Sequence, residues 1–142
     1  SREIISHGGG AAIVPVDSEG NVYLVEQYRV ATGKTLLEIP AGKLEESENP
    51  LECAERELTE ETGLKAESIV PLTAYYPTPG YSSEKIYVYL AGGLSQHAPC
   101  RDEGEFLHVV KIPFAEAYKM VAEGQIEDSK TVVGILMAKE IL

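Results

Sequence analysis

Residues 42–64 read GKLEESENPLECAERELTEETGL, and this stretch predicts a loop followed by a short helix. Pro50 suits the first helical position because its missing N–H needs no partner there, and Asn49 suits the N-cap. Gly63 suits the position just after the helix, where a left-handed backbone closes the last turn. The sequence therefore predicts a helix from about Pro50 to Thr62.

One side of this helix is apolar and is expected to face the core. It consists of Leu51, Ala54 and Leu58. The carboxylates of Glu57, Glu60 and Glu61 flank that side within an arc of about 100°. Like charges at this spacing repel each other, and a hard cation with a preference for oxygen ligands relieves the repulsion. A solvated acidic face is the alternative, but the acids border the apolar side instead of lying opposite it, which favours a metal site.

Every fixed position of one known motif is present in this stretch. The motif is the Nudix box, G-x5-E-x7-R-E-U-x-E-E-x-G-U with U a bulky apolar residue, and the matching residues are Gly42, Glu48, Arg56, Glu57, Leu58, Glu60, Glu61, Gly63 and Leu64. The chain thus resembles the Nudix hydrolases, which hydrolyse a nucleoside diphosphate linked to another moiety. The resemblance implies the α/β class, as a Nudix-type α/β/α sandwich with a mixed sheet.

The same resemblance implies roles for the residues of the box. The expected ligands of Mg2+ (or Mn2+) are Glu57 and Glu61, then Glu60 and the backbone carbonyl of Ala41. A metal held there polarises phosphoryl oxygens and lowers the pKa of bound water, so that water attacks a diphosphate. Arg56 is expected to orient the glutamates, Glu48 to brace the loop, and Glu60 and Arg56 to count among the catalytic residues.

The composition of the chain limits the number of domains, the location and the partners that are expected. The 142 residues are 44% apolar and 25% charged, which predicts one globular domain over residues 1–142. No apolar run approaches the length of a membrane span, no signal peptide is visible, and Cys53 and Cys100 form no disulfide framework, so a cytoplasmic location without membrane contact is expected. A net charge of −11 without a basic stripe argues against a nucleic-acid partner. It does not exclude an anionic small substrate, because a metal inverts the local field.

Strands are predicted on both sides of the box helix. They are Ala11–Val16, Val22–Tyr28, Lys34–Ile39, Ser68–Tyr76 with an interruption at Pro71, Lys85–Ala91, and Phe106–Ile112. An irregular polar loop is expected over residues 92–105. One further helix is expected to open at Pro113 and close at Gly124, and a last one to run from Asp128 or Ser129 to about Lys139. This order indicates a mixed sheet between helices.

Residues outside the box resemble the ADP-ribose pyrophosphatase branch of the Nudix hydrolases. They comprise Glu26–Arg29, Glu38–Lys43, Pro79 in the loop beyond the box, and the ending Asp128–Thr131. The branch implies hydrolysis of ADP-ribose or a related ADP-sugar to AMP and a sugar phosphate. Two alternatives stay open: a hydrolase of another nucleotide sugar, such as GDP-mannose, or of a nucleoside triphosphate, and a sensor that binds such ligands without turnover. The intact carboxylates argue against the sensor.

The substrate is expected to meet residues on two segments outside the box. These candidates are Arg29, Glu38, Tyr28, Pro79, Gly80 and Glu84. The guanidinium of Arg29 suits bidentate pairing with a diphosphate, and a surface ion pair is its alternative. Tyr28 offers a ring for stacking on a base or ribose, although core packing explains a tyrosine equally well. Glu38 and Glu84 add metal or substrate contacts in this hypothesis.

A glutamate on a loop between late strands often activates the water in this branch. Glu103 and Glu105 lie in that loop, and Glu105 is favoured because it directly precedes a predicted strand. A solvated charge run is the alternative. The branch also implies a homodimer, although it usually carries tens of residues before the first strand, whereas few precede Gly8 here.

Overall fold

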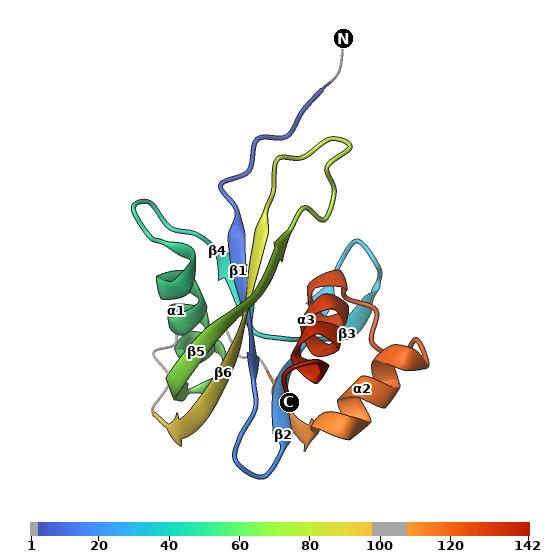
Figure 1. The fold of residues 1–142 in the computed structure, drawn as a ribbon. Coiled ribbons are helices and arrows are strands. Elements are labelled where there is room, and N and C mark those ends of the chain that lie inside the picture. The colour runs from blue at the N-terminus through green and yellow to red at the C-terminus, as the bar shows by residue number, and fades with distance from the viewer. Residues whose placement is uncertain (1–2, 98–107) are drawn as a thin grey trace.

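The computed structural model describes residues 3–97 and 108–142 (Figure 1). The strands of this part are β1 Gly10–Pro15, β2 Asn21–Arg29, β3 Lys34–Glu38, β4 Ala41–Lys43, β5 Leu64–Tyr75, β6 Ile86–Gln96 and β7 His108–Pro113. The helices are α1 Pro50–Thr62, α2 Phe114–Ala122 and α3 Ser129–Lys139. The predicted α/β class with a mixed sheet is confirmed.

The strands form two sheets. The first has the order β4-β1-β6-β5, in which β1 runs parallel to β6 and the other pairs are antiparallel. The second has the order β3-β2-β7 and is antiparallel throughout. In Figure 1, α1 lies on one side of the first sheet, whereas α3 and α2 lie on the other side.

Strand β1 is buried along its whole length because helices cover both of its faces. Ala11 and Ile13 belong to the apolar cluster beneath α1, while Ala12 and Val14 belong to the cluster beneath α2 and α3. This alternation follows from the period of two in a strand. On the α3 side the approach is close, since a Cβ on Gly134 would lie 2.9 Å from a methyl carbon of Val14.

Helix α1 has the predicted ends. The side chain of Asn49 accepts a hydrogen bond from the Glu52 amide at 2.9 Å, and Gly63 has a φ of 76°. The prediction that Leu51 faces the core is wrong, because its exposed fraction is 39%. Cys53 is fully buried instead, with its sulfur 3.5 Å from the carbonyl oxygen of Gly42. The buried side of α1 is therefore turned toward β4.

Three strand predictions need correction. Ala41–Lys43 was not predicted as a strand, because the strand Lys34–Ile39 was expected to end before it and a loop to start at Gly42, but these residues pair with β1 as β4. Residues 92–96 were expected in the irregular loop but continue β6, because β5 starts at Leu64, earlier than predicted, and pairs with them. The expected interruption at Pro71 is confirmed as a register shift between Pro71 and Thr73. Residues 98–105 of the expected loop, and the predicted strand start at residues 106–107, lie outside the described residues.

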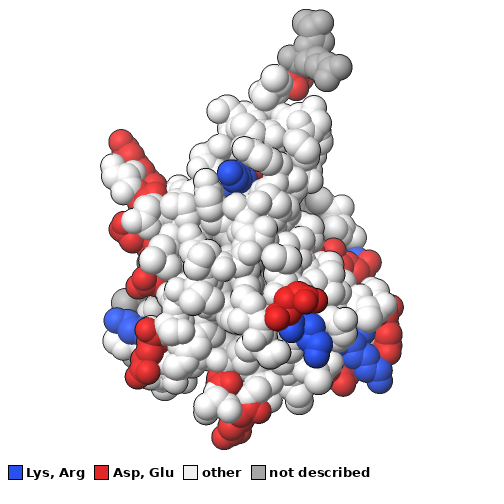
Figure 2. All heavy atoms as spheres, in the orientation of Figure 1, with Lys and Arg blue, Asp and Glu red and all other residues white. Residues whose placement is uncertain are grey.

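The charge of the molecule is unevenly distributed. Figure 2 shows acidic side chains along the edge that carries α1 and the loop before it, whereas the centre of this face is mostly uncharged. Within residues 3–97 and 108–142, no helix is both long and apolar enough to cross a membrane.

Candidate active site

The contact between β4 and α1 places the first carboxylate. Gly42 lies in the middle of β4, and a Cβ at that position would overlap the carboxylate of Glu57. The backbone of β4 is fixed from its other side, because it pairs with Gly10 and Ala11 of β1. The glycine of the box is thus explained by the space that Glu57 occupies.

We expect Gly42→Ala to lower turnover by about 10- to 100-fold, because displacement of a positioned group by about 1 Å has an effect of that size. The melting temperature should change little, since the overlapping atoms belong to the end of a flexible side chain. Gly92→Ala is the matched control, because a Cβ there meets only the Ser68 hydroxyl, at 3.8 Å. Steady-state kinetics and thermal unfolding of both variants measure the effect, and equal activities would contradict this account of Gly42.

Glu57 and Glu61 form a carboxylate pair on α1. Burial raises the pKa of both groups, and the negative charge of Glu57 is the second cause that raises the pKa of Glu61, to about 9. A hydrogen bond from the Ala41 backbone acts in the opposite direction on Glu61. Two carboxylates that are desolvated and adjacent favour a cation between them.

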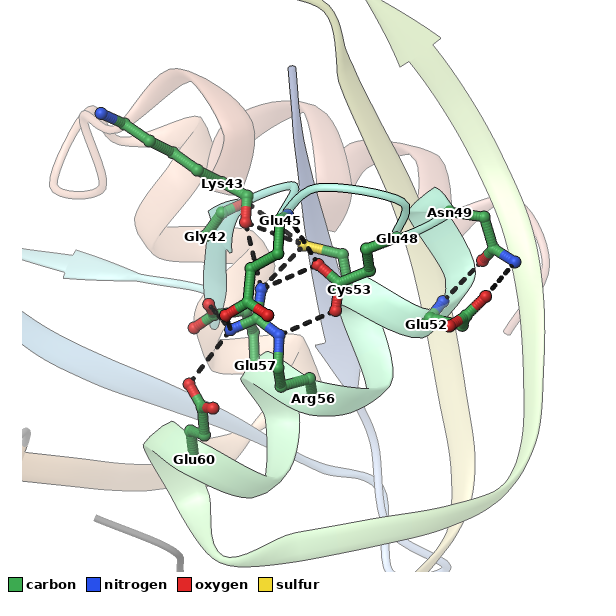
Figure 3. A network of polar contacts seen from close by, with 10 residues as sticks. All are labelled: Gly42, Lys43, Glu45, Glu48, Asn49, Glu52, Cys53, Arg56, Glu57 and Glu60. Atoms are coloured by element: carbon green, nitrogen blue, oxygen red, sulfur yellow. Dashed lines mark hydrogen bonds and ion pairs between the residues drawn. The ribbon is translucent and has the colours of Figure 1, made fainter. Parts of the chain in front are cut away.

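Arg56 connects Glu57 to the preceding loop (Figure 3). Its Nε and Nη2 donate to the two carboxylate oxygens of Glu48 at 2.8 and 2.9 Å, and its Nη1 donates to Glu57 at 2.8 Å. Nη2 also donates to the Lys43 carbonyl at 3.1 Å. The hydrogen bonds from Arg56 are the main reason that the pKa of Glu48 falls to about 2. These contacts support the expected roles, in which Glu48 braces the loop and Arg56 orients Glu57.

Glu60 is more exposed than the other two box carboxylates, Glu57 and Glu61. It accepts from Arg56 Nη1 at 3.2 Å, and 42% of its side chain is exposed. Accordingly, the described part of the chain contains no group of three or more His, Cys, Asp or Glu side chains gathered around a metal position. The Glu57–Glu61 pair beside the Ala41 backbone nevertheless fits Mg2+, which needs only one or two carboxylates in addition to water and substrate phosphates.

A second charged group lies at the end of β3. Arg29 pairs with Glu38 through two parallel hydrogen bonds, Nε–Oε2 at 2.7 Å and Nη2–Oε1 at 2.6 Å. Lys130 of α3 donates to the same carboxylate at 2.8 Å. The charge of Glu61 raises the pKa of Arg29 and the charge of Lys130 lowers the pKa of Glu61, so this group lies within electrostatic reach of the carboxylate pair. Sequence reasoning missed Lys130, although the ending Asp128–Thr131 pointed to this segment.

The other predicted substrate residues belong to β2 and to the β5–β6 connection. Tyr28 is near the end of β2 with an exposed fraction of 61%. Pro79, Gly80 and Glu84 belong to the β5–β6 connection at the top of Figure 1, where Glu84 lies 3.6 Å from the imidazole of His7.

A cavity of about 580 Å3 opens beneath this connection and is bounded by the loop before α1. Glu48, Tyr76, Lys85 and Tyr87 contribute to its wall, whereas Glu57 and Glu61 do not. Arg29 and its partner Glu38 are linked to the carboxylate pair by the charge interaction between Arg29 and Glu61. Glu103 and Glu105, the predicted bases, lie outside the described residues.

Comparison with known proteins agrees with this geometry. The family model of the NUDIX domain matches residues 6–132. In a solved structure titled as that of an ADP compounds hydrolase, the same fold recurs with a TM-score of 0.85 and 27% identity, over 94% of this chain and 72% of that one. The chain therefore belongs to the Nudix family, as a pyrophosphatase that resembles the ADP-ribose pyrophosphatases.

The sequence similarity to curated relatives extends over most of the chain. An ADP-ribose pyrophosphatase of Bacillus subtilis (strain 168) is 41% identical over 145 residues, which cover 99% of this chain and 78% of that protein. A methanol dehydrogenase activator of Bacillus methanolicus is also 41% identical, over 94% of this chain and 74% of its own. A GDP-mannose pyrophosphatase of Yersinia enterocolitica is 36% identical, over 93% and 74%.

Proposed function

We propose that this protein hydrolyses the diphosphate of ADP-ribose, or of a related ADP-sugar, to AMP and a sugar phosphate with the help of Mg2+ or Mn2+. The observation that carries the proposal is the Glu57–Glu61 pair, which is desolvated on α1 near β4 and interacts electrostatically with the cations Arg29 and Lys130. Negative groups for a metal and a positive group for a phosphate thus lie within electrostatic reach of one another, which suits a diphosphate substrate.

Each residue has a separate part in this proposal. Glu57 and Glu61 would hold the metal, which when bound would polarise the phosphoryl oxygens and lower the pKa of water. Arg56 keeps Glu57 in place. Arg29 binds the diphosphate through the N–H groups that Glu38 does not take. Glu105, or else Glu103, accepts the proton of the attacking water.

The names of the relatives support a nucleotide-sugar substrate. The Bacillus subtilis relative is named for ADP-ribose and the Yersinia enterocolitica relative for GDP-mannose, and the identity is higher to the former. We therefore place ADP-ribose first and GDP-mannose second. The homodimer and the cytoplasmic location stay predictions.

A product assay with Mg2+ tests the substrate. It compares ADP-ribose, GDP-mannose, NADH, diadenosine polyphosphates and nucleoside triphosphates at equal concentration. We expect the highest kcat/KM for ADP-ribose, with AMP as product and loss of activity in EDTA. Faster cleavage of another compound would retain the metal chemistry and refute the ADP-ribose assignment. Binding of ADP-ribose without cleavage of any compound would support the sensor.

A further inference from the structure

Glu38 is a fully buried carboxylate at the end of β3, with an exposed fraction of 1%. A charge at such a position is stable only when paired, and both oxygens of Glu38 are used by Arg29 and Lys130. Burial alone would raise the pKa of Glu38. The hydrogen bonds and charges of Arg29 and Lys130 outweigh this effect and lower the pKa below its ordinary value. A substrate therefore has no access to the carboxylate itself.

The contacts of Lys130 continue into a closed ring. Its Nζ lies 3.0 Å from each carboxylate oxygen of Asp128, the N-cap of α3. Asp128 accepts from the Thr131 hydroxyl at 2.6 Å, and that hydroxyl accepts from the Ile39 amide at 2.9 Å. The ring thus returns to the residue after Glu38. Two separate attachments, one through Lys130 and one through Thr131, hold the end of β3 against the start of α3.

Arg29 is the exposed end of this arrangement. Its side chain is 44% exposed, compared with 2% for Glu38 and 12% for Lys130. A guanidinium carries five N–H groups. Two of them donate to Glu38, and the others have no acceptor within the described part of the chain. The free N–H groups belong to a side chain whose orientation is fixed by a planar, two-point contact.

We propose that Glu38, fixed by Lys130, is a positioning residue that orients Arg29 toward the bound diphosphate. This inference rests on the proposed function and deepens it. It also replaces the expectation that Glu38 contacts metal or substrate directly, because both of its oxygens are buried in contacts within the chain. Glu38 acts through Arg29, and Lys130 acts through Glu38.

A double-mutant cycle on the full chain tests the proposal, with Arg29→Ala, Glu38→Gln and both together. We expect each single variant to lower kcat/KM by about 10- to 100-fold, as misplacement of a positioned group does. If Glu38 acts only through Arg29, Glu38→Gln should not lower kcat/KM further when Arg29→Ala is already present. The two single variants should also change KM and kcat in the same proportion. Effects that multiply would indicate a general structural role and overturn the proposal.

Controls separate the possible failures. Glu127→Gln removes the exposed ion pair of Glu127 with Lys34, also on β3, and should leave kcat/KM unchanged. If Glu38→Gln does not fold, Glu38→Asp keeps the charge but shortens its reach, and it enters the same cycle. A folded Glu38 variant with full activity would refute the positioning role, whereas full activity of Arg29→Ala would refute the role of Arg29. A wild-type protein that cleaves no diphosphate refutes the proposed function itself.

Discussion

Glu57→Gln is expected to lower turnover with Mg2+ by about 10³-fold or more, because loss of a metal ligand removes several kcal/mol of transition-state stabilisation. The change is nearly isosteric, so the fold should survive. In EDTA the variant should be at least as stable as the wild type, since the substitution removes a carboxylate whose ionised form burial disfavours. Saturating Mg2+ should then raise the melting temperature of the wild type more than that of the variant.

Kinetics and thermal unfolding with and without Mg2+ measure both parts of this prediction. Glu55→Gln is the matched control, because Glu55 is exposed on the same helix. It should retain wild-type turnover and the wild-type response to Mg2+. Substantial turnover by Glu57→Gln would contradict the assignment of Glu57 as a metal ligand.

Arg56→Ala is expected to lower both stability and turnover. The substitution removes the two-point contact with Glu48 and the contact with Glu57, and it leaves both carboxylates, 11% and 12% exposed, without their cation. Breaking such a largely buried pair lowers the free energy of unfolding by about 2–3 kcal/mol. Lys119→Ala is the control, because its pair with Glu123 is exposed and contributes less than about 0.5 kcal/mol. Urea unfolding at neutral pH measures the difference.

The Arg56 effect should also depend on pH. Because pairing with Arg56 is the main cause that lowers the pKa of Glu48 from 4.5 to about 2, with the Glu45 amide second, the stabilisation from this pair is present above pH 4.5 and is lost as the pH falls toward 2. The stability difference between wild type and Arg56→Ala should therefore shrink over that interval. A difference that stays constant down to pH 2 would show that packing of the Arg56 side chain, and not its charge, stabilises the loop.

The local features of the fold were predictable from the sequence because neighbouring residues determine them. The ends of α1 at Asn49 and Gly63 agree with the prediction, since capping depends on residues within one turn. The contacts of Arg56 with Glu48 and Glu57 agree with the roles that the resemblance to the Nudix box implied for these residues.

Contacts between distant segments account for the errors. Ala41–Lys43 becomes a strand only because β1 lies beside it, and Gly92 and Gly93 stay in β6 only because β5 pairs that far. Leu51 has the right helical angle for burial but is exposed, because α1 packs toward β4 through Cys53. Lys130 could not be placed beside Glu38 from the sequence, because the two are joined only by tertiary structure.

The short connection between β3 and β4 has a consequence for how homologous chains can differ in length. Glu38 ends one strand and Gly42 lies in the next, and both are tied to partners on different helices. One inserted residue would move the chain by about 3.3 Å and reverse the facing of its side chains. Insertions are thus expected in the turn at residues 17–20, where nothing from the site is attached, and not between Glu38 and Gly42.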